Sequence, residues 1–495
     1  MADRREIANE GLAAYVGITA PETPRFLLAN NFLLEYFEPF GKAEQEYNYE
    51  TCIAMETLYT EDEKNERQLR YSFDRFLRKY LGEDSIREGN SRLNRNRHYY
   101  FPVTQNMLAS STPTLRHMLF YLQNIGKNFD FKKTQALLEQ YIFQDDTGIN
   151  HIFRILFQNQ EEKSRLKSGV DKKAVDSFWS MLESAERGRM VKLGGQLNGD
   201  LETLLTHRYF CGLDFYRRYN YLAVLLTSYV IQYIVCRAGS SACILCQGAP
   251  IDSRLNGAVH RASCNNYANI RKLFPKLLTD FYKDAITKNP ENEILRIRAS
   301  EQEIYINNKE FNAFFRENNL ARKTNLHYED IRKTFELGEG EERKLSVEEL
   351  VMRYIDLTGS RRGSTLTKIS STLPTSGRQI DMIFPRNRSR QKYFAMSETL
   401  SEFYVRLYLA RKNQKYDYLD NFIEDLQNRY RIVIKKSAEG EKMLRSMRIT
   451  LNAQEYAKNQ AAFIDVLNNI NCLIKLSDSG YVVTLPEEKG AFKLI

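Results

Sequence analysis

Residues 452–486 read NAQEYAKNQAAFIDVLNNINCLIKLSDSGYVVTLP, and this stretch decides the fold of the C-terminal part of the chain. In its first half, large apolar residues recur at three- and four-residue spacing, as an amphipathic helix requires. These residues are Tyr456, Phe463, Leu467 and Ile470. The second half holds two short apolar runs around a Ser-Asp-Ser-Gly turn and ends at Pro486, which is the pattern of a β-hairpin. The stretch therefore predicts a helix that is followed directly by a hairpin.

Two more amphipathic helices are predicted upstream, in SETLSEFYVRLYLARK (397–412) and YLDNFIEDLQNRYRIVI (418–434). Each places its apolar residues on one face. They are Leu400, Phe403, Tyr404 and Leu407 in the first helix, and Leu419, Phe422, Ile423, Leu426 and Tyr430 in the second. Three helices followed by a hairpin are typical of a winged helix, a relative of the helix-turn-helix in which the hairpin forms the wing. We therefore predict a basic segment followed by a winged-helix-like domain in residues 346–495.

The composition is that of a globular protein with several domains. The chain has 495 residues, of which 42% are hydrophobic and 27% are charged, so it is too long for one compact core and too apolar for a disordered protein. Helical periodicity dominates the N-terminal part, and we expect a mainly α, multidomain protein with a helical scaffold in residues 1–220. Residues 221–340 hold an apolar helix, a group of Cys and His residues, and a short β-hairpin around residues 294–306. The charged, Gly-containing segment LGEGEERKLSVEEL (337–350) predicts a domain boundary.

The sequence indicates neither export nor a membrane span. Its first residues, MADRREIANEG, carry charges where a signal peptide needs an apolar core. The longest apolar run, Tyr221–Val235, is interrupted by three polar residues and is shorter than the roughly 20 residues that span a bilayer, so we expect a buried helix. Seven cysteines, an odd number, point to a reducing compartment in a chain without export signals. We therefore expect a cytoplasmic protein that has no membrane contact.

Four residues of the middle segment have the spacing of a metal site. Two residues separate Cys243 from Cys246, and thirteen residues later His260 is followed by Cys264 at one helical turn. Zinc prefers four tetrahedral ligands of these types, and four protein ligands leave no position for water. We therefore predict a structural zinc ion in a small zinc-finger-like unit. Two alternatives stay open, namely free thiols in a helical core and a redox pair formed by the first two cysteines.

A basic segment lies directly before the predicted winged helix. Between residues 359 and 394 the chain carries eight cations against one acid, Asp381, among many Ser, Thr and Gly residues. The cations are Arg361, Arg362, Lys368, Arg378, Arg386, Arg388, Arg390 and Lys392. Such a density of cations beside hydroxyls and backbone amides suits contact with phosphates, so we predict that this segment binds DNA. A second run, SRLNRNRHYYF (91–101), mixes arginines with aromatic rings as single-strand binders do; a solvated surface is the alternative for both runs.

The sequence contains none of the common catalytic motifs. It lacks a phosphate-binding loop that ends in Lys-Ser or Lys-Thr, a Gly-x-Ser-x-Gly elbow and a His-Glu-x-x-His pair. In the Cys and His group, Ala262 stands where a zinc deaminase carries a Glu. We therefore assign no catalytic residue and expect a DNA-binding accessory subunit that is not an enzyme. The alternatives are a docking subunit for an ATPase or nuclease without DNA contact, and a nuclease with an unrecognised acidic site.

The C-terminal third resembles accessory proteins of bacterial DNA-defence cassettes. The resemblance covers roughly the last 120 residues and rests on the order of three segments, DMIFPRNRSRQKYFAMSETLSEFYVRLYLA, then FIEDLQNRYRIVI, then NINCLIKLSDSGYVVTLP. The DptG component of phosphorothioation-dependent restriction is one candidate family among several. The resemblance implies a cytosolic bacterial protein that works beside a separate ATPase or nuclease, and it supplies no catalytic residue.

Overall fold

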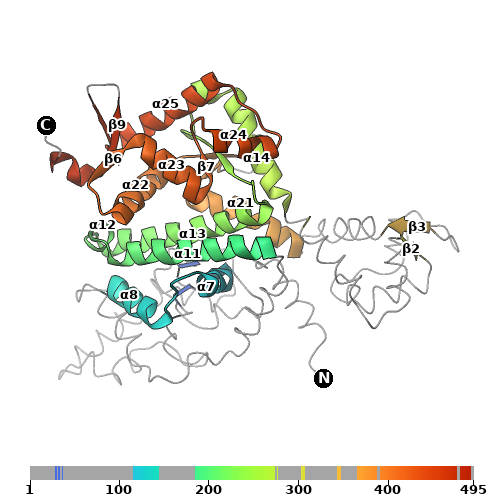
Figure 1. Cartoon of the computed structure of the whole chain (residues 1–495), viewed down its shortest axis with the longest axis horizontal. Helices are drawn as coiled ribbons and strands as arrows, with labels where there is room; N and C mark the ends of the chain where they lie inside the picture. Colours follow the sequence, from blue (N-terminus) through green and yellow to red (C-terminus); the bar gives the residue numbers. More distant parts are fainter. Residues whose placement is uncertain are drawn as a thin grey trace, which may run out of the picture.

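The computed structural model describes residues 115–143, 184–273, 365–386, 391–476 and 480–491, with strands at 303–306 and 343–346 and single positions 28, 29, 32, 33, 36 and 276. Helices dominate these residues (Figure 1), which confirms the prediction of a mainly α protein. The arginine and tyrosine run at 91–101 lies outside the described residues.

Long helices form one layer of the structure. The helices α11 (Ser184–Thr206) and α13 (Phe215–Ala238) pack against each other, and the short α12 (Arg208–Cys211) connects them. On the other side of α11 lie α7 (Leu115–Ile125) and α8 (Phe131–Phe143) (Figure 1). The N-terminal part of the chain is therefore helical where it is described, as its periodicity predicts.

The helices α7 and α11 meet at a contact between glycines. A methyl group at Gly194 in α11 would overlap the carbonyl oxygen of Leu122, and one at Gly126 would overlap the backbone of Gly194. Only a residue without a Cβ permits this approach. Next to it, Nδ2 of Asn198 donates a hydrogen bond to the carbonyl of Gln123 at 3.0 Å, which fixes the two helices in this register.

The helix α13 is the central helix of the core. It is long and apolar enough to cross a membrane, but 94% of its most apolar window is buried inside the fold. Its N-terminus is capped by Asp214, whose side chain accepts a hydrogen bond from the backbone N–H of Arg217 at 3.0 Å. The buried helix predicted for Tyr221–Val235 is therefore confirmed.

A four-stranded sheet packs beside α13, and its topology is not predicted from the sequence. The central strand β1 (Ile244–Gln247) pairs in parallel with β5 (Tyr393–Ala395) and with β7 (Ile432–Val433). The strand β4 (Ile383–Phe384) pairs antiparallel with β5. The first of these strands comes from the stretch expected to form a zinc finger, and the others come from the predicted basic segment and C-terminal domain. The middle and C-terminal parts of the chain therefore share one sheet.

Helices cover both faces of this sheet. Side chains alternate along a strand, so Ile244 and Cys246 face the large core that contains α13, whereas Cys243 and Leu245 face a smaller cluster on the opposite side. The helices around the smaller cluster are α14 (Ala258–Arg271), α24 (Ala438–Ser446) and α25 (Ala453–Asn469). One further helix, α21 (Thr365–Gln379), packs on α13 and β4.

The C-terminal helices and hairpin lie where they are predicted. Their inward residues are buried, except that Ile470 is partly exposed. The elements are α22 (Glu398–Lys412), α23 (Leu419–Tyr430), α25, and the antiparallel strands β8 (Leu473–Lys475) and β9 (Tyr481–Thr484), followed by η3 (Pro486–Ala491). An additional strand, β6 (Tyr416–Tyr418), pairs with β9, so the strand order of this second sheet is β6-β9-β8.

The hairpin expected around residues 294–306 is described only in its second run, because Ile294 and Leu295 lie outside the described residues. The strand β2 (Glu303–Ile306) pairs antiparallel with β3 (Arg343–Ser346), with Ile304 opposite Leu345. The strand β3 lies inside the segment whose charge and glycines predict a linker. The period of two therefore identifies the strand at 303–306, and its pairing with β3 is an addition to the prediction.

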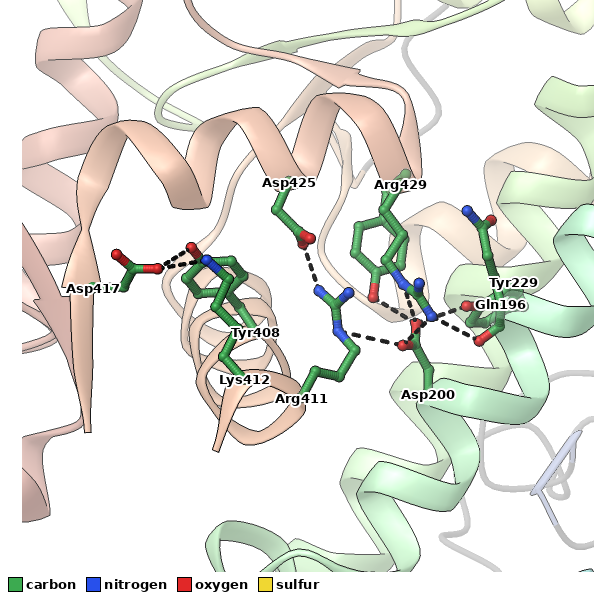
Figure 2. A network of polar contacts seen from close by, with 10 residues as sticks. Gln196, Asp200, Tyr229, Tyr408, Arg411, Lys412, Asp417, Asp425 and Arg429 are labelled. Atoms are coloured by element: carbon green, nitrogen blue, oxygen red, sulfur yellow. Dashed lines mark hydrogen bonds and ion pairs between the residues drawn. The ribbon is translucent and has the colours of Figure 1, made fainter. Parts of the chain in front are cut away.

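Asp200 connects the helical layer to the half that contains the sheet. This residue of α11 is fully buried, and its carboxylate accepts hydrogen bonds from the hydroxyls of Tyr229 at 2.7 Å and Tyr430 at 2.5 Å. Figure 2 shows two guanidinium groups beside the same carboxylate. Nη2 of Arg429 lies 2.6 Å from Oδ1, and Nε of Arg411 lies 3.4 Å from it. The carboxylate therefore joins side chains from α11, α13, α22 and α23.

The polar network continues along α22 and α23 (Figure 2). Arg411 also pairs with Asp425, at 2.5 Å. Farther along, Asp417 accepts hydrogen bonds from Tyr408 at 2.6 Å and Lys412 at 2.7 Å. Burial alone would raise the pKa of Asp417, but these hydrogen bonds outweigh it and lower the pKa to about 2.

Candidate functional site

Only two of the four predicted zinc ligands, His260 and Cys264, lie side by side. Cys246 lies in β1 and Cys243 lies directly before it, and both are fully buried. Their spacing of three places the thiols on opposite faces of the strand, one in the core beside α13 and the other in the cluster with α14. His260 and Cys264 share one face of α14, as the sequence predicts, with Nε2 3.7 Å from Sγ.

The structure therefore does not bring the four side chains together. In the described residues, no three His, Cys, Asp or Glu side chains are grouped so that they could hold a metal ion. Burial raises the pKa of Cys243 to about 12 and that of Cys246 well above its usual range, whereas zinc binds thiolates. This arrangement matches the alternative of free thiols in the core. The zinc ion stays a prediction for metal analysis.

His260 and Cys264 instead line a pocket beside the sheet. Its volume of about 700 Å³ is typical of a site for a small ligand. Its lining residues, which we call the basic pocket, are His260, Arg261, Cys264, Asn265, Tyr267, Ala268, Arg271, Lys272, Ser370, Gln391 and Lys392. Four of them are Arg or Lys, and no carboxylate occurs among the described lining residues.

The helix α14 supplies most of the basic pocket because of the way it is fixed to the sheet. On its sheet side, Asn266 Oδ1 accepts a hydrogen bond from the N–H of Leu245, and the hydroxyl of Ser263 donates to the carbonyl of Leu245, both at 2.9 Å. The lining residues 261, 264, 265, 268, 271 and 272 recur at helical spacing on another face. The two polar anchors therefore decide which cations of α14 reach the pocket.

Three residues that line the pocket, Tyr267, Arg271 and Lys392, form a group with Arg378, which lies behind the lining. We call these four side chains the cation–tyrosine cluster. Burial lowers the pKa of Lys392, and the charges of Arg378 and Arg271 lower it further. Burial raises the pKa of Tyr267, against the effect of the same two arginines. The four groups therefore lie within electrostatic reach of one another. Tyr267 is only 3% exposed, and its hydroxyl has no hydrogen-bond partner within the described structure.

Backbone carbonyls orient two cations of this cluster. Nε of Arg378 donates to the carbonyl of Pro374 at 2.9 Å, and Nζ of Lys392 donates to that of Pro385 at 2.8 Å. Each of these contacts fixes the position of its cation. Arg271 forms no ion pair with a carboxylate of the described ranges, and the same is true of Arg261 and Lys272, its neighbours along α14.

Three of the eight cations predicted to contact DNA have described side chains. Lys392 lines the basic pocket, and Arg378 belongs to the cation–tyrosine cluster. Arg386 is 65% exposed and pairs with Asp381 at 2.6 Å. The side chains that lie outside the description are those of Arg361, Arg362, Lys368, Arg388 and Arg390. The predicted basic segment therefore contributes to the pocket, but it does not form the pocket alone.

Three cations of the pocket lie outside the predicted basic segment, namely Arg261, Arg271 and Lys272. All three lie in VHRASCNNYANIRKLF (259–274), the segment that also carries the predicted metal ligands. Their helical spacing, with Ala268 between them, is a signal of a basic stripe. This signal is visible once the segment is considered as one helix, and the spacing of Cys and His residues obscures it.

His260 fixes the end of the pocket that lies against the strands. Its Nδ1 is 3.0 Å from Nε2 of Gln247, the last residue of β1, and its ring packs edge-on against Tyr393 with 4.6 Å between centroids. The amide nitrogen is a donor, so Nδ1 accepts this hydrogen bond. Burial raises the pKa of Cys264, which keeps its thiol protonated at neutral pH. The pocket therefore offers cations and hydrogen-bond donors, which is the chemistry of anion binding.

The helix that precedes the β8–β9 hairpin, α25, presents little positive charge. Its single cation, Lys458, pairs with Glu455 at 3.3 Å. Two of its residues, Ala462 and Val466, pack against α14 and η2 (Ser253–Leu255). Part of the surface of α25 is therefore occupied by other elements of the fold.

In comparisons with known proteins, no family model matches the chain, and neither a curated protein nor a solved structure matches it.

Proposed function

We propose that this protein binds nucleic acid by holding its phosphate backbone at the basic pocket. The observation that carries the proposal is the pocket itself, where four cations from two distant segments converge and no described lining residue is acidic. Contacts between such cations and phosphates supply most of the sequence-independent affinity for nucleic acid. The net charge of +9 acts in the same direction, because it favours encounter with a polyanion.

We further propose that the C-terminal elements form a winged-helix-like unit that supports the pocket and does not read bases. Three helices, α22, α23 and α25, followed by the β8–β9 hairpin, and the strand order β6-β9-β8, support this fold, with β7 and α24 inserted between α23 and α25. A helix that reads bases needs exposed side chains that reach base edges, and arginine makes the commonest specific contact. The only cation of α25 is Lys458, which is already paired, and this favours contact with phosphates over contact with bases.

The decisive experiment measures DNA affinity against salt concentration. The test variant combines Arg261→Ala, Arg271→Ala and Lys272→Ala, and the control is Arg217→Ala. Arg217 is also exposed, and it lies at the start of α13. This helix has 24 residues and is about 36 Å long, and its other end lies near the sheet, so Arg217 is far from that end. Fluorescence anisotropy with single-stranded and duplex DNA should give an affinity that falls with salt in the wild type and in the control.

In the triple variant we expect the slope of log affinity against log salt to be smaller by about 2 to 3, because each lost phosphate contact lowers it by about one. A wild-type protein that binds neither form of DNA at low salt would refute the proposal, as would a triple variant that binds like the control. A stoichiometric co-purifying partner without DNA binding would favour a docking role beside an ATPase or nuclease, which stays a prediction from the resemblance. Cleavage of the DNA in the presence of a divalent metal would indicate a nuclease.

A further inference from the structure

The wall of the basic pocket formed by the cation–tyrosine cluster has the properties of a built ligand site. Only 3% of Tyr267 is exposed to solvent, and its hydroxyl has no hydrogen-bond partner among the described residues. Buried hydroxyls are normally hydrogen-bonded, because an unpaired one loses its contacts with water without replacement. A bound group that accepts a hydrogen bond at this wall would satisfy the hydroxyl.

The charges around this hydroxyl define the kind of acceptor. Arg271 and Lys392 line the pocket together with Tyr267, and the charge of Arg378 also acts on Tyr267 and Lys392. Asp381, the single acid of the basic segment, is engaged by Arg386 at 2.6 Å. Cations that lie close together attract an anion to the space that they share. The acceptor that fits this wall is therefore an anion that has several oxygens.

We infer that the cation–tyrosine cluster is a receptor for a phosphate monoester, the group that ends a nucleic-acid strand. This inference rests on the proposed function and names the part of the nucleic acid that the pocket recognises. A phosphate monoester carries a charge of about −1.5 to −2 at neutral pH, against −1 for a phosphate inside the chain. Three cations and a hydroxyl donor match the larger charge and the three free oxygens of the monoester, and guanidinium groups can bind two oxygens at once.

The size of the pocket agrees with a strand end. A volume of about 700 Å³ exceeds what a phosphate fills and approaches that of a nucleotide-sized ligand. Arg261, one of the exposed lining cations, lies ten residues and nearly three helical turns from Arg271 along α14. A terminal phosphate bound at the cluster therefore leaves room for the terminal nucleotide in the pocket. The phosphates that follow along the strand then reach Arg261.

The test compares strands that differ only at their ends. A short single-stranded oligonucleotide is prepared with a 5′-phosphate, with a 3′-phosphate or with hydroxyls at both ends, and its affinity is measured by anisotropy at one fixed salt concentration. We expect one of the phosphorylated strands to bind about tenfold more tightly than the hydroxyl-ended strand, because it adds charge and charge-assisted hydrogen bonds. A nucleoside monophosphate and inorganic phosphate are used as competitors, which separates recognition of a strand end from recognition of a free nucleotide or of phosphate alone.

Two variants assign the preference to the cluster. Tyr267→Phe removes only the hydroxyl, and Arg378→Lys keeps the charge but removes the fork of donors. Both should reduce the affinity for the strand with a terminal phosphate several-fold more than the affinity for the hydroxyl-ended strand. The control Tyr418→Phe, at a tyrosine that is 59% exposed on β6, should retain the preference, and circular dichroism checks that each variant is folded.

The two proposals fail in distinguishable ways. Equal affinity of the wild type for all three strands, with binding still dependent on Arg271, would overturn the monoester site and leave backbone binding intact. The same holds if the preference persists in both Tyr267→Phe and Arg378→Lys. If the protein binds none of the strands, nucleic-acid binding is refuted. The phosphate site is still supported in that case if inorganic phosphate raises the melting temperature of the wild type but not that of Tyr267→Phe.

Discussion

Replacement of Asp200 by Asn should destabilise the protein more than any other single change in the polar network of Figure 2. The substitution keeps the shape of the side chain and removes the charge that lies between Arg429 and Arg411. Arg411 keeps its second partner, Asp425, at 2.5 Å. Arg429 keeps only the carbonyl of Gln196, at 3.0 Å, so one guanidinium loses its only carboxylate in the described structure.

The magnitude follows from burial. Removal of one partner from a buried ion pair costs about 3–5 kcal/mol. Asp200 is fully buried, but the side chain of Arg429 is 22% exposed, so water offsets part of the loss. We therefore expect the free energy of unfolding to fall by about 3 kcal/mol, at the lower end of that range. The matched control is Asp425→Asn, because Asp425 is 22% exposed and its partner Arg411 keeps Asp200; its cost should be about 1 kcal/mol or less.

The assay is urea unfolding followed by far-ultraviolet circular dichroism at neutral pH. The midpoints of Asp200→Asn, Asp425→Asn and wild type are compared, and a common slope converts their differences into free energies. The double variant Asp200→Asn with Arg429→Gln should recover part of the loss, because it removes the uncompensated charge as well. If Asp200→Asn is no less stable than Asp425→Asn, the carboxylate of Asp200 does not compensate the two arginines and the reasoning is wrong.

Three further predictions concern packing, pH and metal content. Gly194→Ala should cost about 1–3 kcal/mol or more, because the new methyl overlaps the carbonyl of Leu122, whereas Gly188→Ala in the same helix meets nothing within 4 Å and should be neutral or stabilising; melting temperatures of the two variants test this. Burial raises the pKa of four tyrosines well above 10, namely Tyr141, Tyr219, Tyr229 and Tyr430. Because their pKa is higher in the folded state than in the unfolded state, their contribution to stability is complete below about pH 10 and is lost as the pH rises above it; an unfolding midpoint in urea that stays constant into this range would contradict the prediction. Cys246→Ser should leave the zinc content of the purified protein unchanged, because its thiol faces away from Cys243, and should cost about 1–3 kcal/mol through its unpaired hydroxyl; a loss of one zinc per chain, measured by metal analysis, would instead support the four-ligand site.

The sequence predicts the C-terminal helices well because their signals are local. The apolar residues of α22, such as Phe403 and Leu407, recur at helical spacing, and Ser397 caps the helix by accepting a hydrogen bond from the N–H of Leu400 at 3.2 Å. The two strands of the hairpin are separated by a short turn that the sequence also marks. Each of these features depends on residues within one or two turns of the chain.

The parallel sheet is not predicted, because its strands are short and its partners are distant. The strand Ile244–Gln247 has four residues and pairs with Phe394 and Ile432, which follow it by more than 140 positions. Four buried residues show no alternation of polar and apolar side chains, so a central strand cannot be distinguished from the end of a buried helix. The two cysteines in and beside this strand then suggest a metal site, although alternation along the strand sends their thiols to opposite faces.

The sequence by itself determined the helices, the C-terminal hairpin and the presence of cations in the segment before it. Only the tertiary structure decided that Lys392 lines the same pocket as Arg271 of α14 and the buried Tyr267. The physical reason is the difference between local and distant interactions. Periodicity, caps and turns act within a few residues, whereas the basic pocket exists because burial of β1 between β5 and β7 brings segments more than 100 residues apart to the same edge of a sheet.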